Sequence, residues 1–141
     1  MKVYKSKISY GLLFAVFFLF VIITYFQVVN NSSFKSLLII SIIHVSTFLF
    51  LLYIFYNIDY TIEGKTLKIR CGFLFKKNIE IEKITAISKT NSLLSLPVAS
   101  ITDRIELNYG KSSSIIISPK NKMAFIEDLI KLNPNINNQI K

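Results

Sequence analysis

The sequence is poor in the residue types that build most catalytic and metal sites. It contains one cysteine, Cys71, one histidine, His44, and no tryptophan among its 141 residues. A single cysteine excludes a disulfide within the chain and every cysteine-based metal pattern. Because the histidine lies inside a long apolar run, the polar remainder of the chain can form neither a histidine–cysteine zinc site nor a serine–histidine–aspartate triad. We therefore predict no catalytic residues, no metal site and no cofactor.

Acidic residues are absent from the first 58 positions, and all eight of them follow Ile58. Within this part of the chain, residues 8–29 and residues 37–58 contain no Asp, Glu, Lys or Arg. A helix needs about 20 residues to cross the hydrocarbon core of a bilayer, and lipid offers an open backbone no hydrogen-bond partners. We predict a hairpin of two membrane-spanning helices. The first run exceeds the apolar core of a signal peptide, roughly 7–15 residues, so we expect it to be retained.

Most of the net charge of +9 lies in the two segments that flank this hairpin, and Lys35 in the break between the runs adds one further charge. Residues 1–7 contain three lysines, and residues 59–141 contain thirteen basic and eight acidic residues. Because cytoplasmic segments beside membrane spans are rich in lysine and arginine, we predict that both termini are cytoplasmic and that residues 30–36 face outward. Residues 1–7 are interpreted as a basic tail that either attracts anionic lipids or only sets the orientation, and we favour the second interpretation.

Three polar residues interrupt the second apolar run at three-residue spacing: Ser41, His44 and Thr47. This spacing places them near one face of a helix. One hypothesis is a polar site within the bilayer, with His44 as a proton carrier or ligand. The other is that neutral side chains bond to the backbone or pack against the first span. We favour the second, because neither run contains a charged residue that could form a relay with His44.

After Ile58 the apolar pattern changes from a continuous run to alternation, which is typical of half-buried strands. Leu67, Ile69 and Cys71 share one face of such a strand, while Lys68 and Arg70 share the other. Cys71 is therefore predicted to be a buried, inert thiol. The alternation continues to residue 117 and predicts about six strands.

A helix is predicted over residues 119–132, after these strands. Ser118 is a suitable N-cap, and Pro119 is suited to the first helical position. The apolar residues of this segment recur at helical spacing and comprise Phe125, Ile126, Leu129 and Ile130. Asn133 and Pro134 end the helix, and residues 135–141 are predicted to be a frayed tail. The pattern indicates a small antiparallel barrel that is closed by one amphipathic helix.

Residues 59–134 also carry a family resemblance. The residues concerned are Tyr60, Ile62, Leu67, Ile69, Gly72, Ile81, Ile84, Ile87, Ser100, Asp103, Arg104, Tyr109, Ile116, Ser118, Pro119, Lys120, Phe125 and Ile126. This pattern resembles the small bacterial pleckstrin-homology-like (PH) family found behind membrane spans. The resemblance implies an α+β fold, a PH-like antiparallel split barrel capped by one C-terminal helix. It implies a recognition surface rather than a reaction.

Two features of the PH family have no clear counterpart in the sequence. The full fold has seven strands, so one strand is predicted to be short, missing or hidden within residues 91–100. The clustered basic residues with which eukaryotic members bind phosphoinositides cannot be placed either, and Lys76 and Lys77 are the nearest candidates. Binding of lipid headgroups is therefore not carried over.

The candidate interaction residues form three groups: Leu93, Leu94, Leu96 and Val98; Asp103 and Arg104; and Ser118 and Lys120. The first group either covers the end of the barrel or binds a partner. Asp103 and Arg104 are interpreted mainly as a structural pair or a strand cap. Ser118 and Lys120, together with Lys122, begin the predicted helix, where an anion can bind, although an ordinary helix cap explains Ser118 equally well.

We therefore expect two parts, a basic tail with a two-span hairpin over residues 1–58 and a cytoplasmic PH-like domain over residues 59–141. The expected function is a non-enzymatic interaction or scaffold module at the inner face of a bacterial membrane, with a protein partner or a second copy. The alternatives are protection against a membrane-active peptide toxin and sensing of anionic lipids. Nucleic-acid binding is disfavoured because the positive charge is modest and mixed with acidic residues, and no small-molecule ligand is expected.

Overall fold

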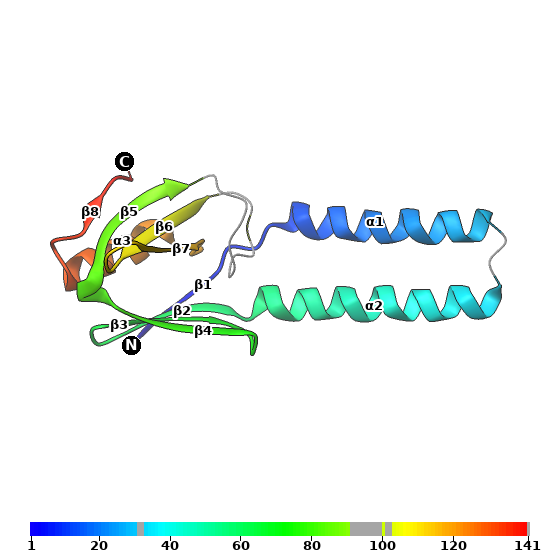
Figure 1. The fold of residues 1–141 in the computed structure, drawn as a ribbon, viewed down its shortest axis with the longest axis horizontal. Helices are drawn as coiled ribbons and strands as arrows, with labels where there is room; N and C mark the ends of the chain where they lie inside the picture. The colour runs from blue at the N-terminus through cyan, green and yellow to red at the C-terminus, as the bar shows by residue number, and fades with distance from the viewer. Residues whose placement is uncertain (31–32, 91–99, 101–102, 141) are drawn as a thin grey trace.

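The computed structural model describes residues 1–30, 33–90, 100 and 103–140. Two long helices lie side by side and project from a domain of strands (Figure 1). The elements are, in chain order, β1 (Lys2–Lys5), α1 (Tyr10–Val29), α2 (Phe34–Tyr56), β2 (Ile58–Glu63), β3 (Thr66–Cys71), β4 (Phe75–Glu80), the 3₁₀ turn η1 (Ile81–Lys83), β5 (Ile84–Thr90), β6 (Arg104–Tyr109), β7 (Ser113–Ile117), α3 (Lys122–Leu132) and β8 (Asn137–Asn138).

Helices α1 and α2 confirm the prediction of two long apolar helices. They contain 20 and 23 residues, and both are long and apolar enough to cross a membrane. Helix α2 begins three residues earlier than predicted because Ser33 caps it, with the Ser33 side chain accepting a hydrogen bond from the Ser36 backbone N–H. Leu13 is the one buried side chain among the residues of these two helices.

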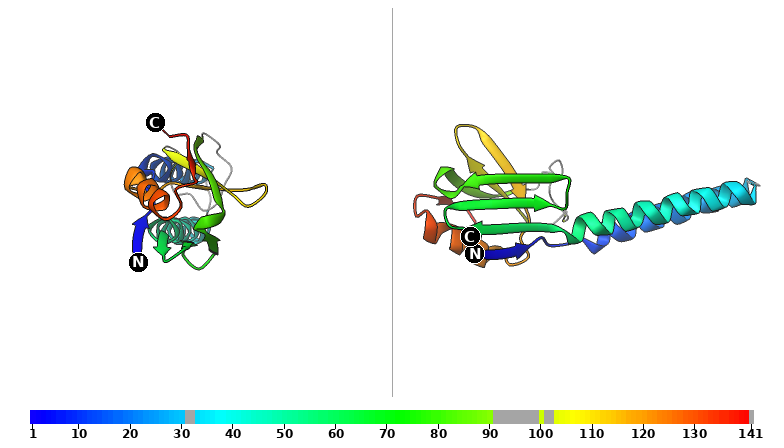
Figure 2. Two further views of the ribbon diagram at one scale, coloured as in Figure 1. Left: turned by 90° about the vertical axis from the view of Figure 1, so that its left-hand side faces the viewer. Right: turned by 90° about the horizontal axis from the view of Figure 1, so that it is seen from below.

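The domain consists of two sheets that face each other across the core (Figure 2). One sheet has the antiparallel order β1-β2-β3-β4, and the other has the order β7-β6-β5-β8, in which β8 is parallel to β5. The inward faces alternate as predicted, and Tyr60, Leu67, Ile69, Leu107 and Phe125 are all fully buried. The fold is the predicted PH-like arrangement of two sheets and one helix.

Strand β1 corrects the interpretation of residues 1–7 as a basic tail. Lys2 to Lys5 pair with β2 in antiparallel register, and Tyr4 lies opposite Tyr60. With β1 included, the described residues form seven antiparallel strands, whereas the sequence indicated about six. The additional strand precedes the apolar helices, while residues 91–99, where a hidden strand was considered, lie outside the described residues. The hairpin is thus inserted between the first two strands of the domain.

Helix α3 begins later than predicted, and Ser118 is not its N-cap. The helix starts at Lys122 after Asn121, while Ser118 and Pro119 lie against the N-terminal segment. The Lys7 N–H donates to the Ser118 carbonyl oxygen at 2.7 Å, and the Lys120 N–H donates to the Lys5 carbonyl oxygen at 2.9 Å. The helix cannot start at Pro119, because residues 118–120 already pair with residues 5–7.

Residues 136–139 of the predicted frayed tail pair with the domain. Ile136 is buried, and Asn137 and Asn138 pair with β5. The Gln139 N–H donates to the Ile87 carbonyl oxygen at 2.9 Å. Asn133 fixes the start of this segment, because its side-chain amide donates to the Ile81 carbonyl oxygen at 2.9 Å. The short strand β8 therefore covers the β5 edge of the second sheet.

Candidate functional site

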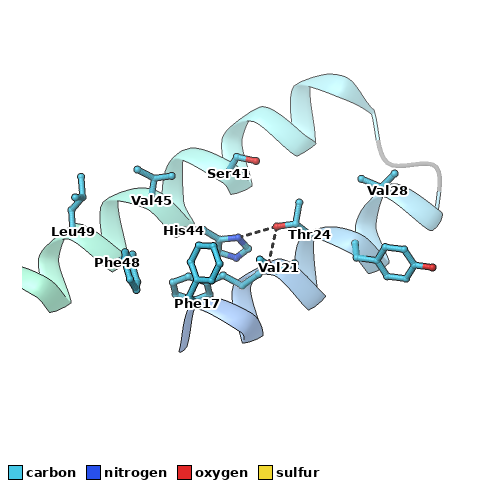
Figure 3. A pocket seen from close by; sticks show the side chains of 11 residues that line it. Phe17, Val21, Thr24, Val28, Ser41, His44, Val45, Phe48 and Leu49 are labelled. Atoms are coloured by element: carbon cyan, nitrogen blue, oxygen red, sulfur yellow. Dashed lines mark hydrogen bonds between the residues drawn. The ribbon is translucent and has the colours of Figure 1, made fainter. Parts of the chain in front are cut away.

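An apolar cavity of about 510 Å³ lies between α1 and α2 (Figure 3). Its lining comprises Phe17, Phe20, Val21, Thr24, Tyr25, Val28, Ser41, His44, Val45, Phe48 and Leu49. Thr24, Ser41 and His44 place polar atoms among these side chains, and the rest of the lining is aliphatic or aromatic. The cavity therefore suits an apolar occupant that can make one or two hydrogen bonds.

His44 contacts the first helix, as the favoured of its two sequence interpretations predicted. Its ring stacks on that of Phe20 with centroids 4.5 Å apart, and Nδ1 lies 3.2 Å from Thr24 Oγ1. Thr24 Oγ1 also donates to the Phe20 carbonyl oxygen at 2.9 Å. With the hydroxyl proton directed at the Phe20 carbonyl oxygen, Thr24 Oγ1 can accept a hydrogen bond from His44 Nδ1.

The three polar residues of α2 are only partly brought together. Ser41 and His44 line the cavity, whereas Thr47 is exposed and is not part of its lining. Each step of three residues turns a helix by about 300°, so two steps rotate Thr47 by about 120° away from Ser41. The sequence prediction of one shared face holds for the first pair and not for Thr47.

The three lysines of the N-terminal segment each form an ion pair with an aspartate of the domain. The pairs are Lys2–Asp128 at 2.7 Å, Lys5–Asp59 at 2.6 Å and Lys7–Asp103 at 3.3 Å. These contacts connect residues 2–7 with β2, with α3 and with the residue before β6. Sequence reasoning missed this cluster because four residues are too few to show a period. The sequence did contain one signal of a further strand, because it predicts about six strands whereas the full PH fold has seven.

Asp59 is the most enclosed of these carboxylates, with 5% of its surface exposed. Lys5 and Arg70 contact it from the two neighbouring strands, at 2.6 Å and 3.0 Å. Burial by itself would raise the pKa of Asp59, but the two cations outweigh burial and lower it. The residue is therefore ionised at neutral pH and joins β1, β2 and β3 close to the ends of both apolar helices.

Tyr4 and Asp128 join β1 to α3. The Tyr4 hydroxyl donates to the Asp128 carboxylate, and its ring packs edge-on against Phe125 with centroids 5.2 Å apart. Burial and the hydrogen bond with Asp128 raise the pKa of Tyr4 to about 12. Hydrogen bonds from Lys2 and Tyr4 lower the pKa of Asp128. These contacts are structural, since all of them fasten the N-terminal strand to the helix.

Asp103 and Arg104 occupy structural positions at the start of β6. Asp103 has a positive φ of 62° and binds Lys122 and Lys7. The hydrogen bond from Lys122 and the contact with Lys7 lower the pKa of Asp103. Arg104 is buried, and its Nε donates to the Ser100 carbonyl oxygen. The anion that Lys122 holds is thus a carboxylate of the chain itself.

Of the remaining candidate residues, the structure describes Ser118 and Lys120 but not the four apolar ones. Ser118 is fully buried, and its backbone N–H donates to the Tyr60 hydroxyl at 3.2 Å. Lys120 is exposed and contributes its backbone N–H to the pairing with Lys5. Leu93, Leu94, Leu96 and Val98 lie outside the described residues, so their proposed role stays a prediction.

Cys71 lies on the buried face of β3, and burial raises the pKa of its thiol. A raised pKa keeps the thiol protonated at neutral pH and therefore weakly reactive. Within the part of the chain that the structure describes, no group of three His, Cys, Asp or Glu side chains could hold a metal ion.

Strand β4 forms an edge of the first sheet, since its one neighbour among the described strands is β3. Lys76, Asn78 and Glu80 alternate along it as exposed side chains. Lys77 points to the other side, where its Nζ lies 5.2 Å from the centre of the Tyr109 ring. An edge strand presents backbone N–H and C=O groups that a further strand can pair with. Strand β4 is thus a candidate surface for an extended peptide.

The domain matches the model of a known protein family. The family model described as "Bacterial PH domain" matches residues 58–133, from the first residue of β2 to the residue after α3. A search of curated proteins gave no match, and neither did a search of solved structures. The matched range omits β1, although β1 lies in the same sheet as β2.

Proposed function

Because the chain belongs to the bacterial PH domain family, we propose that it is a non-enzymatic interaction module, held at the inner face of a bacterial membrane by helices α1 and α2. Proteins of this fold act through surfaces that bind other molecules. In this chain both helices enter the sheet directly, α1 through the residues after β1 and α2 through Asn57 before β2. The domain is therefore held close to the ends of the two helices.

The exposed surface of the hairpin supports a membrane setting. Large apolar side chains point outward along both helices, with Phe14, Phe18 and Ile42 exposed by 64%, 62% and 65%. Such a surface is stable only under an apolar cover, and a bilayer provides that cover for a helix of 20 or more apolar residues. The lysines of residues 1–7 and the bases of the domain favour cytoplasmic termini through the positive-inside rule.

The observation that carries an interaction role is the open edge of β4. Its exposed side chains, Lys76, Asn78 and Glu80, are polar, and charged residues on an edge strand oppose indiscriminate pairing with other sheets. A protein partner with an extended segment could pair with this edge, gaining affinity from backbone hydrogen bonds and specificity from alternate side chains. We therefore place the contact with a protein partner, or with a second copy, at β4.

Site-specific photo-crosslinking in cells tests this surface. A photoreactive amino acid replaces Asn78 on β4, and a matched control replaces Lys111, which is exposed in the turn between β6 and β7. We expect a defined adduct from position 78 and none from position 111. Equal adducts at both positions, or none at position 78, would contradict the assignment to β4.

A second version of the experiment separates the domain from the helices. The spans Tyr10–Val29 and Phe34–Tyr56 are replaced by an unrelated two-span hairpin. Residues 1–9 and residues 57–141 are kept, because β1 belongs to the sheet. If the adduct at position 78 persists, recognition resides in the PH domain. If it disappears while the domain remains folded, recognition requires the native helices.

Protection against a membrane-active peptide toxin is a second candidate, and the cavity between α1 and α2 favours it. The cavity is apolar and lies within the hairpin, where such a peptide would be dissolved. Cells lacking the protein should then be sensitised to a particular peptide. The native protein should restore resistance, whereas Val45→Trp, which fills the cavity, should not. Unchanged sensitivity across a peptide panel would count against this function.

Sensing of anionic lipids through the basic surface of residues 59–141 is the third candidate, and the N-terminal lysines add little to it. The ammonium groups of Lys2, Lys5 and Lys7 are paired with aspartates of the domain. A lipid phosphate would have to compete with these carboxylates. A lipid sensor of this kind would lose binding steeply as salt is raised, and salt-insensitive vesicle binding would exclude it.

A further inference from the structure

The turn between β3 and β4 carries two exposed apolar side chains. Phe73 and Leu74 are exposed by 70% and 56%. They follow Gly72, whose φ of +51° suits the tight turn. The turn is held by two backbone hydrogen bonds, from the Gly72 N–H to the Asn57 carbonyl oxygen at 2.7 Å and from the Leu74 N–H to the Cys71 carbonyl oxygen at 3.1 Å. The apolar side chains are therefore displayed by a fixed backbone.

This turn lies against the domain-side end of α2 (Figure 1). The centre of the Phe73 ring is 6.1 Å from that of Tyr53 and 6.3 Å from that of Phe50. Helix α2 ends at Tyr56, so Tyr53 and Phe50 lie roughly 4.5 Å and 9 Å back along the helix axis. Phe73 thus reaches beside the apolar surface of α2 rather than toward the distal side of the domain.

The medium that surrounds this part of α2 also surrounds the turn. In a membrane, Tyr53 and Tyr56 belong at the level of the headgroups, and Phe50 belongs at the edge of the acyl chains. An aromatic ring that contacts both Phe50 and Tyr53 lies at the same depth. Lys76 follows two residues after Leu74 and is exposed, so the turn is followed by a positive charge that anionic headgroups would attract.

We propose that the β3–β4 turn inserts Phe73 and Leu74 into the inner leaflet, at the boundary between headgroups and acyl chains. The partner of this surface is lipid, and the argument is the continuity of the turn with the apolar surface of α2. The inference rests on the proposed membrane setting of the helices. The inserted turn is a third attachment of the domain to the membrane, besides the chain connections to α1 and α2. Three attachments fix the tilt of the domain relative to the membrane.

A fixed tilt bears on how the domain is presented to its partner. Strand β4 begins at Phe75, directly after the inserted turn. The start of the β4 edge is then held at the membrane surface, and the edge leads away from it toward Glu80. A segment that pairs with β4 would therefore be recognised close to the bilayer.

Fluorescence of a single label in lipid nanodiscs tests the insertion, with one copy of the full chain in each disc. Cys71 is first replaced by alanine, and single cysteines are then introduced for an environment-sensitive nitrobenzoxadiazole label. The test position is Leu74, the control for a water-exposed turn is Lys111, and the control for the spanning helices is Leu49, which is exposed on α2. Lipids that carry a nitroxide at a shallow or a deep position serve as quenchers.

We expect the label at position 74 to be blue-shifted and quenched at least twofold more by shallow nitroxides than the label at position 111. The label at position 49, one residue before Phe50, should also be quenched by the nitroxide lipids, because α2 lies in the bilayer there. If position 49 is quenched while position 74 behaves like position 111, the proposed insertion is overturned and the spanning helices are retained. If position 74 is blue-shifted but not quenched, protein covers the turn, and the assignment to lipid is wrong.

Failure of the control at position 49 has a different meaning. An unquenched label there would show that α2 does not lie in the bilayer, and it would overturn the membrane setting together with the insertion. The substitution Phe73→Asp supplies a second comparison. It should reduce the quenching at position 74 to the level of position 111, and unchanged quenching would show that Phe73 does not hold the turn in the leaflet.

Discussion

Large apolar side chains are buried inside the PH domain but exposed along the helical hairpin. The domain turns Tyr60, Leu107 and Phe125 into a closed core, where all three are fully buried, whereas the hairpin leaves Phe14 and Phe18 more than 60% exposed. In the domain, apolar side chains are removed from water by one another. Along the hairpin they stay exposed, and in the proposed setting the bilayer removes them from water. Stability in the domain should therefore depend on shape and packing, whereas on the hairpin it should depend mainly on hydrophobicity.

Matched truncations of phenylalanine should show this contrast most strongly. Phe125 packs against Tyr4 and Tyr60, so Phe125→Ala leaves a cavity and should destabilise the domain by about 3–5 kcal/mol. Phe18→Ala on the exposed face of α1 should leave domain stability nearly unchanged. Pulse proteolysis of the full chain in lipid nanodiscs, over a urea series, measures both variants. Equal losses would contradict the separation of the two regions.

Ion pairs provide the next comparison, between an enclosed carboxylate and an exposed one. Asp59→Ala removes the contacts with Lys5 and Arg70 and should cost about 1–3 kcal/mol of domain stability. Glu63→Ala removes an exposed pair with Lys68 and should leave domain stability nearly unchanged. The same proteolysis assay applies. The expectation fails if Glu63→Ala proves as damaging as Asp59→Ala.

Acid should weaken the attachment of β1 while leaving the apolar hairpin intact. Folding lowers the pKa values of Asp59, Asp103 and Asp128, so their contribution to stability is present above the usual aspartate pKa of about 4. That contribution is lost as the pH falls below about 4 and the native carboxylates become protonated. Urea midpoints measured between pH 7 and pH 3 should fall, and Asp59→Asn should flatten the fall. A midpoint that rises on acidification would have the wrong sign.

The smallest expected effect concerns the hydrogen bond between the two helices. Thr24→Val removes the hydroxyl that contacts His44 but leaves the stacking of His44 on Phe20, and it should weaken helix association by about 0.6 kcal/mol, the typical value for such bonds in membranes. Thr47→Val is the matched control because Thr47 is exposed and lies outside the cavity lining. Unfolding in sodium dodecyl sulfate reports helix association. Indistinguishable variants would mean that packing alone holds the hairpin.

The positions of the polar candidates show how far sequence reasoning extends. It placed Asp103 and Arg104 in a structural role and left Ser118 between a cap and an anion site. In the structure Asp103 binds Lys7, which lies 96 residues earlier. The Ser118 carbonyl oxygen accepts a hydrogen bond from the Lys7 N–H. Neither partner is close in sequence, and no local pattern connects residues so far apart.

The sequence by itself determined the elements that depend on local composition. Two charge-free runs of helical length, alternating strands and the stripe of α3 are properties of neighbouring residues, because burial selects side chains at a fixed period. The tertiary structure alone decided that residues 2–5 form a strand, that α3 starts at Lys122 and that the β3–β4 turn lies against α2. Four residues of a strand cannot hold their conformation alone. They are stabilised by pairing with β2 across the inserted hairpin, by the aspartates of the domain and by packing against Phe125.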